Sequence, residues 1–260
     1  MQKLCQNVCD LTKKVGFFIK EQRNSFTSNK IEIKGRNDFV SYVDKKAEEQ
    51  LVAGLSILLP EAGFIAEEGT STHKGDEYNW IIDPLDGTTN FIHGVPCFAI
   101  SIALMRKNTL VMGVIYEINL DECFYAWEGS KAYMNGKEIK VSENATLASS
   151  LLATGFPYYD YNRMDAYMEL FKYFMKNTRG LRRLGSAATD LAYVACGRFE
   201  GFYEYSLQPW DVAAGAFIVQ QAGGKVSDFS GNDNYIFGRE IIASNANSFD
   251  ELLGAVKKFF

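Results

Sequence analysis

The chain has 260 residues, of which 47% are hydrophobic and 23% charged, and its formal net charge at pH 7 is −5. This length and composition are typical of a globular protein with one large domain or two small ones. A net negative charge without a compensating cluster of Lys and Arg argues against a nucleic-acid partner.

The cysteines and histidines exclude several kinds of site. The five cysteines are scattered and include no CxxC pair, which argues against a disulfide framework or a zinc knuckle. Two histidines, His73 and His93, are too few for a His-rich metal site or a Ser-His-Asp arrangement. The N-terminus lacks the pattern of a signal segment, and the longest apolar stretch, 95–105, is too short to span a bilayer. We therefore expect a cytoplasmic protein without a membrane partner.

Two amphipathic helices are predicted near the N-terminus. Apolar residues recur at steps of three and four between Leu4 and Phe18, and the same spacing recurs in residues 41–59. A turn and a short strand follow, and they lead into two adjacent glutamates, Glu67 and Glu68.

A sheet is predicted next. Residues 80–82 are apolar without alternation, which is typical of a strand that is buried on both faces. We expect this strand to end at Asp83-Pro84, because proline cannot continue a central ladder. A hairpin is predicted with its turn at Asn135-Gly136. The strands between them are expected at residues 98–105, 110–116 and 122–127.

The second half of the chain alternates between strands and helices. Such a pattern predicts a layered α/β sandwich, with a lobe boundary near residues 142–150. Ser186 and Ser248 are expected to cap the helices that they open. The predicted strands span residues 151–155, 199–205 and 240–244, and the predicted helices span residues 164–176, 186–196, 211–222 and 248–260.

Four carboxylates lie within twenty residues, in the segments AEEGT and DPLDGTT. Burying like charges this close together is costly unless a cation lies between them. If Pro84 turns the chain, Asp83 and Asp86 face the same side and the Leu85 carbonyl is left free. These hard oxygen donors suit Mg²⁺ or Mn²⁺ better than zinc. The alternatives, for each segment alone, are a structural turn and a solvated loop.

The segment Gly87-Thr88-Thr89 follows directly. Glycine lets the backbone approach a ligand closely, and a helical turn that opens here would point free N–H groups at an anion such as phosphate. A metal site beside such an anion site is what phosphoryl chemistry requires.

Three further acids each have two interpretations. Asp44 is either a helix-start carboxylate that interacts with the helix dipole or part of the site. Asp211 is either an N-cap or a distant metal ligand. Glu204 lies in an aromatic strand and is either a surface charge at the strand end or part of the site.

The segments GRNDFVSYVD, AEEG, WIIDPLDGTTNF, RRLGSAATDLAYVACGRFEGFYE and QPWDVAAGAFIVQQAGG resemble the inositol monophosphatase family over nearly the whole chain. DPLDGTTNF followed by a late WD is the most specific part. The resemblance implies a magnesium-dependent, lithium-sensitive phosphatase and a homodimer. It also implies an alternating α-β-α-β-α layered sandwich like that of inositol monophosphatases and fructose-1,6-bisphosphatases. We expect a single unit, 1–260, with a metal and phosphate lobe, 1–145, and a substrate lobe, 146–260.

The resemblance also implies the metal ligands. Glu67, Asp83 and the Leu85 carbonyl would hold one Mg²⁺. Asp83, Asp86 and Asp211 would hold a second Mg²⁺. A third, looser ion would use Glu67 again, largely through water, and Mn²⁺ could substitute.

Catalytic and substrate-binding roles follow in the same way. The backbone N–H groups of Gly87 and Thr88 would bind the phosphate group. Thr88 and Glu67 would orient the attacking water, and Asp44 would accept a hydrogen bond from the Thr88 hydroxyl. The substrate hydroxyls would be held by Asp86, Glu204 and the backbone N–H of Ala187. The resemblance also implies a lysine over the site on a mobile loop, and Lys34 is the candidate, but its spacing to Asp44 does not align with the family and we assign it no role.

The expected substrate is a small phosphorylated polyol, myo-inositol 1-phosphate, because GTTNF and Glu204 favour the inositol branch. One alternative is a sugar bisphosphatase, a nucleotide bisphosphatase or a broad-specificity phosphatase. A second phosphate group would then need Arg182 or Arg183 to bind it. We favour the interpretation that both arginines are solvated. Another alternative is a protein-binding regulator that retains the fold. The enzyme is favoured because all five expected acids are present. They are the four acids of the metal site, Glu67, Asp83, Asp86 and Asp211, and the expected partner of Thr88, Asp44.

Overall fold

The protein is represented by a computed structural model that describes residues 1–24, 31–35, 38–157 and 160–260, with backbone alone for residues 31–35 and 38–41. The helices are α1 (Gln2–Asn24), α2 (Tyr42–Leu58), α3 (Thr88–His93), α4 (Met164–Asn177), α5 (Ala187–Ala195), α6 (Pro209–Gln221) and α7 (Phe249–Val256). The strands of the first half are β1 (Ile31–Gly35), β2 (Asp38–Ser41), β3 (Gly63–Ala66), β4 (Tyr78–Asp86), β5 (Ala99–Arg106), β6 (Thr109–Glu117), β7 (Glu122–Trp127), β8 (Ala132–Met134) and β9 (Lys137–Ile139). Those of the second half are β10 (Leu151–Thr154), β11 (Gly180–Arg182), β12 (Gly201–Tyr205), β13 (Gly224–Ser227) and β14 (Glu240–Asn245).

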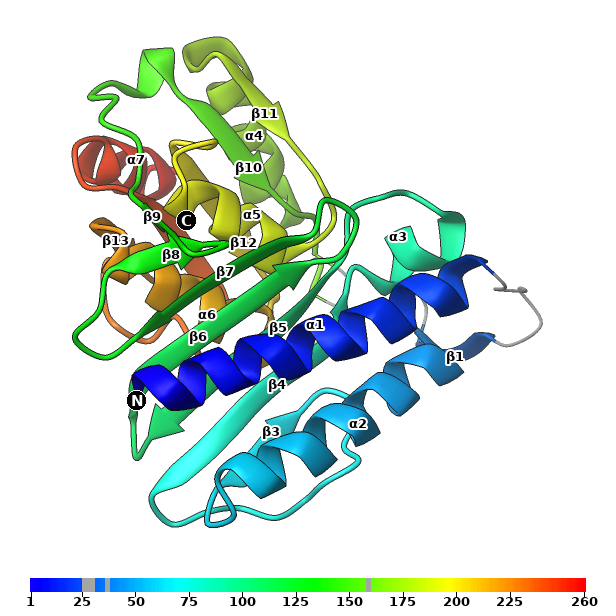
Figure 1. The fold of residues 1–260 in the computed structure, drawn as a ribbon. Coiled ribbons are helices and arrows are strands. Elements are labelled where there is room, and N and C mark those ends of the chain that lie inside the picture. Colours follow the sequence, from blue (N-terminus) through cyan, green and yellow to red (C-terminus); the bar gives the residue numbers. More distant parts are fainter. Residues whose placement is uncertain (25–30, 36–37, 158–159) are drawn as a thin grey trace.

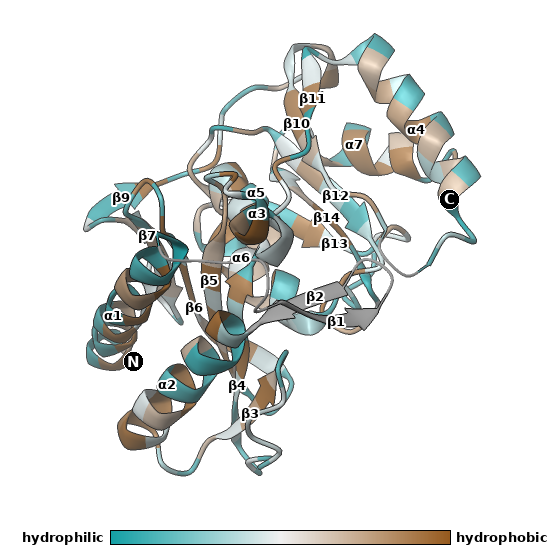
Figure 2. Cartoon of the chain, turned by 90° about the vertical axis from the view of Figure 1, so that its right-hand side faces the viewer, coloured by the Kyte–Doolittle hydropathy of each residue, from teal (hydrophilic) through white to brown (hydrophobic). Residues whose placement is uncertain are grey.

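Helices and sheets alternate in five layers, as Figures 1 and 2 show. Helices α1 and α2 cover the outer face of a seven-stranded sheet, and α5 and α6 fill the space between that sheet and a five-stranded one. Helices α4 and α7 cover the outer face of the five-stranded sheet. The expected α-β-α-β-α sandwich is therefore confirmed.

Strand β4 shows how the layers are held together. Trp80 and Ile82 belong to the apolar core under α1 and α2, whereas Ile81 belongs to the core around α5 and α6. Successive side chains of a strand point to opposite faces, so a strand covered on both sides needs apolar residues throughout. The prediction of a doubly buried strand is confirmed.

The two sheets differ in topology. The seven-stranded sheet has the order β3-β4-β5-β6-β7-β8-β9, in which only β3 and β4 pair in parallel. The five-stranded sheet has the order β11-β10-β12-β14-β13, in which β10 is parallel to β11 and β12. One apolar core draws Phe124 from the first half of the chain and Phe202 from the second. Because this core joins the two halves, it does not mark a boundary between them, and the division into lobes 1–145 and 146–260 stays a prediction.

Three sequence predictions need correction. Strand β4 does not end at Asp83-Pro84 but continues to Asp86, with an irregularity in its pairing. Helix α7 ends at Val256, and the Ser248 side chain makes no cap hydrogen bond. Strands β11 and β13 were missed because segments of three or four residues show too little periodicity. In the described part of the chain, no helix combines the length and apolar composition that a membrane crossing requires.

Candidate active site

The parallel pairing of β3 and β4 brings two acids together. Ala66 is paired with Ile82, so Glu67 and Asp83 are the next residues on the two strands. The Glu67 N–H donates to the Ile82 carbonyl at 3.2 Å, which continues the ladder to this point. Both carboxylates therefore emerge at the same edge of the sheet.

An extra residue in β4 adds a third acid. Asp83 is paired with Ser101 and Asp86 with Ala99, so three steps along β4 match two along β5. This is a β-bulge, and it lies at Pro84, which has no N–H for the ladder. Because the bulge shifts the alternation of side chains, Asp86 turns back toward Asp83. The Leu85 N–H donates to Asp83 Oδ1 at 2.9 Å and fixes the bend.

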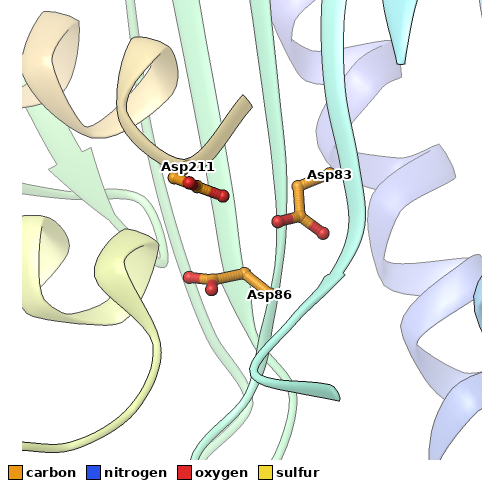
Figure 3. Close-up of side chains that lie close together, drawn as sticks. All are labelled: Asp83, Asp86 and Asp211. Carbon is orange, nitrogen blue, oxygen red and sulfur yellow. The ribbon is translucent and has the colours of Figure 1, made fainter. Parts of the chain in front are cut away.

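Helix α6 supplies the fourth acid, Asp211, from its first turn. One carboxylate oxygen from each of Asp83, Asp86 and Asp211 lies within 4.8 Å of the others, and the three side chains converge in Figure 3. Asp211 also accepts a hydrogen bond from the Gln208 N–H at 2.7 Å, as part of a capping box. Asp211 is the third residue of the helix and not its N-cap. It therefore stabilises the start of α6 and also belongs to the acidic cluster.

Thr88 and Asp44 are brought together as expected. The Thr88 hydroxyl lies 2.9 Å from Asp44 Oδ1 and 3.0 Å from the Leu85 carbonyl. The Leu85 carbonyl was expected to be free, but the Thr88 hydroxyl lies within hydrogen-bond distance of it. Gly87, with φ of 98°, precedes the short helix α3, and only glycine adopts that backbone readily.

Helix α5 binds Asp86 through its N-terminus, a contact that the sequence analysis missed. Asp86 Oδ2 accepts from the Ser186 hydroxyl at 2.7 Å and from the Ala188 N–H at 2.6 Å. The Ala187 N–H also faces Asp86 and, with these two donors, opposes the rise in the pKa of Asp86 that burial causes. In this structure, the N–H expected to hold a substrate hydroxyl is thus already directed at Asp86. The N-cap at Ser186, which was predicted and is confirmed, was the available signal.

The acids open into a cavity of about 320 Å³ whose far wall comes from the second half of the chain. Glu204, on β12, lines that wall as expected, and Asp190 and Gly155 line it without having been predicted. The two arginines separate. Arg182 is exposed and donates to the Leu181 carbonyl, whereas Arg183 lines the cavity. The prediction that both arginines are solvated is therefore correct for Arg182 and wrong for Arg183. The side chain of Lys34 lies outside the described residues.

Burial makes the acidic cluster costly without a cation. It is the main cause that raises the pKa of Glu67 and of Asp83, and neighbouring carboxylates raise both further. Burial also raises the pKa of Asp86 to about 6 and that of Asp211 to about 7. Several of these groups would hold protons near neutral pH unless a positive charge lay among them.

The donor set fits a hard divalent cation. Glu67, Asp83, Leu85, Asp86 and Asp211 line this part of the cavity, and none of the described residues that line it is Cys or His. Mg²⁺ and Mn²⁺ prefer such oxygen ligands, whereas zinc prefers nitrogen and sulfur.

Comparisons with known proteins agree with this geometry. The sequence model of the inositol monophosphatase family matches residues 1–258. The chain belongs to that family, which is a family of phosphatases. It is 42% identical over 229 residues to an inositol-1-monophosphatase of Mesorhizobium japonicum, covering 88% of this chain and 86% of the relative.

Other relatives carry a different name. The chain is 45% identical over 225 residues to a putative Nus factor SuhB of Neisseria meningitidis serogroup B, covering 86% of each chain. The solved structure of the extragenic suppressor protein suhB from Bartonella henselae matches with a TM-score of 0.93 and 39% identity, covering 98% of both chains. The family and the expected fold are thus established together.

Proposed function

We propose that this protein is a Mg²⁺-dependent phosphate monoester hydrolase and that its substrate is myo-inositol 1-phosphate. The observation that carries the proposal is the convergence of Asp83, Asp86 and Asp211 within 4.8 Å beside the Thr88–Asp44 hydrogen bond. The relative named inositol-1-monophosphatase supports the substrate.

The residues present divide into two metal positions. Glu67, Asp83 and the Leu85 carbonyl would hold one Mg²⁺, and Asp83, Asp86 and Asp211 a second. A third, weaker ion would contact Glu67. Bound divalent cations lower the pKa of water and neutralise the charge of a phosphate ester and its leaving group.

Thr88 orients the attacking water in this proposal. Its single hydroxyl proton is donated to Asp44 or to the Leu85 carbonyl. On the cavity side the Thr88 oxygen can therefore only accept a hydrogen bond. A water that donates to Thr88 and to Glu67 then turns a lone pair toward the phosphorus. The N–H groups of Gly87 and Thr88 bind the phosphate oxygens.

Glu204 selects a hydroxyl-bearing leaving group. Glu204 is 5% exposed, and among the described residues no donor lies within hydrogen-bond distance of its carboxylate. A buried acceptor without a donor is unfavourable until a ligand supplies one. A polyol hydroxyl would do so, and Asp86 and the Ala187 N–H are the other candidate contacts.

The test is phosphate release from myo-inositol 1-phosphate, fructose 1,6-bisphosphate and adenosine 3′,5′-bisphosphate, with and without Mg²⁺. We expect Mg²⁺-dependent release with a strong preference for the inositol ester. Release that is independent of Mg²⁺, or absent for all three esters, would contradict the proposal.

A bisphosphatase of the same family is the second candidate, and the position of Arg183 favours it. Arg183 lines the cavity, with its guanidinium carbon 5.2 Å from the centre of the Phe156 ring. If Arg183 binds a second phosphate group, Arg183→Ala raises KM for bisphosphates selectively. Arg182→Ala, on the exposed neighbour, is the matched control. Equal effects of Arg183→Ala on monophosphate and bisphosphate esters would exclude this role.

A role with a protein partner is the third candidate, because several relatives are named Nus factor SuhB. Such a role need not use the acidic cluster, so Asp83→Asn would remove hydrolysis and leave partner binding intact. On the family resemblance we also propose a lithium-sensitive homodimer. A cytoplasmic location is proposed because none of the five cysteines forms a disulfide.

A further inference from the structure

Gly155 and Glu204 are neighbours on the wall of the cavity. Strand β10 runs parallel to β12, and Thr154 at its end is paired with Tyr203. The next residues on the two strands are Gly155 and Glu204, and both line the cavity. Their proximity is thus built into the register of the five-stranded sheet.

The Glu204 carboxylate occupies the space where a side chain at position 155 would lie. A Cβ added to Gly155 would be 2.0 Å from Glu204 Oε1 and 2.1 Å from Glu204 Cδ. Non-bonded heavy atoms approach to about 3.5–4.0 Å at their optimal separation, so this overlap is severe. The φ of Gly155 is outside the left-handed region, so the backbone conformation alone does not require glycine. A side chain at this position would therefore have to displace the Glu204 carboxylate, which is the far end of its side chain.

The backbone at Gly155 is held in place by buried hydrogen bonds. The Tyr167 hydroxyl donates to the Gly155 carbonyl at 2.6 Å, and the Thr154 hydroxyl donates to the Tyr203 carbonyl at 2.7 Å. These hydrogen bonds are buried and tie the end of β10 both to α4 and to β12. On its other sides Glu204 faces the charge of Arg183, which favours its charged form, and the charges of Asp211 and Asp86, which disfavour a move of the carboxylate toward the acidic cluster.

We propose that Gly155 is a positioning residue that determines specificity, because its lack of a side chain lets the Glu204 carboxylate lie against β10. The cavity beside that carboxylate then stays open for the polyol part of a phosphate monoester. This inference rests on the proposed function, in which Glu204 accepts a hydrogen bond from a substrate hydroxyl. A methyl group at position 155 would push the carboxylate into the volume that the polyol needs.

The test compares Gly155→Ala with the wild type on two esters in the presence of Mg²⁺. Myo-inositol 1-phosphate carries hydroxyls that Glu204 can bind, and p-nitrophenyl phosphate carries none. Losing one hydrogen bond to a charged group reduces kcat/KM by about 10- to 100-fold. We expect that loss for the inositol ester, mainly through KM, and little change for the aryl ester. Gly254→Ala is the matched control, because a Cβ there meets no atom within 4 Å.

A double-mutant cycle separates this role from a general loss of structure. Glu204→Ala removes the carboxylate. In that background, adding Gly155→Ala should lower neither the activity nor the Tm any further. If Gly155→Ala alone fails to fold, the inference requires that the double variant Gly155→Ala/Glu204→Ala folds.

Two results would overturn the inference alone: equal losses of kcat/KM for both esters, or an undiminished effect of Gly155→Ala in the Glu204→Ala background. A double variant that does not fold would also overturn it. If the wild type releases phosphate from the aryl ester with Mg²⁺ but not from the inositol ester, the proposed substrate is wrong, and the inference falls with it.

Discussion

The Thr88 hydroxyl donates to Asp44 across 44 positions of sequence, at 2.9 Å, and so joins the start of α3 to the buried first turn of α2. Asp44 is only 1% exposed, so the hydrogen bond is shielded from competing water. A buried acceptor of this kind holds the threonine oxygen in one orientation toward the cavity.

Replacing Thr88 with alanine should therefore lower kcat more than it raises KM. A positioned group that moves or orients a proton contributes about 10²–10⁴-fold to a rate, and we expect a loss of about 10²-fold. Thr88→Ser keeps the hydroxyl and should retain most activity. Steady-state kinetics with Mg²⁺ and the inositol ester measures both variants. Equal activity of the Ala and Ser variants would show that the hydroxyl has no role in the reaction.

Glu48 holds the segment that carries Glu67. Its carboxylate accepts from the Glu68 N–H, the Thr70 N–H and the Thr70 hydroxyl, each at 2.8 Å, and its side chain is fully buried. We expect Glu48→Gln to weaken Mg²⁺ binding, because the segment loses acceptors for its backbone N–H groups. Leaving a buried polar group unsatisfied costs about 1–3 kcal/mol, so the free energy of unfolding should fall by a similar amount.

The neighbouring residue provides the control for this prediction. Glu49 is exposed and, among the described residues, pairs with Lys46 alone, at 2.6 Å, so Glu49→Gln should change neither quantity noticeably. Urea denaturation and calorimetric titration with Mg²⁺ measure both variants. An unchanged Mg²⁺ affinity in a destabilised Glu48→Gln protein would limit Glu48 to a structural role.

The stability of the metal-free protein should fall as the pH rises. Burial raises the pKa of Asp86 to about 6 and that of Asp211 to about 7, above the value of about 3.9 for an unfolded aspartate. The folded state therefore binds more protons than the unfolded state in this range, and stability is lost as pH rises through the folded pKa values. Between pH 5 and pH 8 we expect a lower Tm at each step.

Mg²⁺ should reverse this dependence, because a cation among the carboxylates favours their charged forms. The gain in Tm on adding saturating Mg²⁺ should be larger at pH 8 than at pH 5. Differential scanning fluorimetry in EDTA and in Mg²⁺ makes the comparison. A metal-free Tm that rises over this range, with the same Mg²⁺ gain at both pH values, would argue against a buried cation site.

Periodicity predicted most of the fold because it reflects which face of each element is buried. The alternation of cores along β4 and the spacing of apolar residues in α1 are local properties that a single sequence reveals. The end of β4 was misplaced because Pro84 is accommodated by a bulge, which depends on the pairing with β5.

The acidic part of the site was predictable for a similar reason. Asp83 and Asp86 lie at the end of a buried strand, where acids are uncommon unless they have a partner. Of the far wall only Glu204 was predicted, because Asp190 and Gly155 meet the acids only through packing between layers. Likewise, nothing in the sequence distinguishes Arg182 from Arg183, since only the register of β11 decides which one faces the cavity.

The central claim is that the acids at the end of β4 bind the cations on which hydrolysis depends, and Asp83→Asn tests it most directly. Asp83 would contact both proposed Mg²⁺ ions, and Asn keeps its shape without its charge. Calorimetric titration with Mg²⁺, run beside phosphate release from myo-inositol 1-phosphate, measures both consequences in one preparation. The account predicts loss of Mg²⁺ binding and of phosphate release, with a circular dichroism spectrum like that of the wild type. Wild-type Mg²⁺ binding and substantial phosphate release by the folded variant would contradict it.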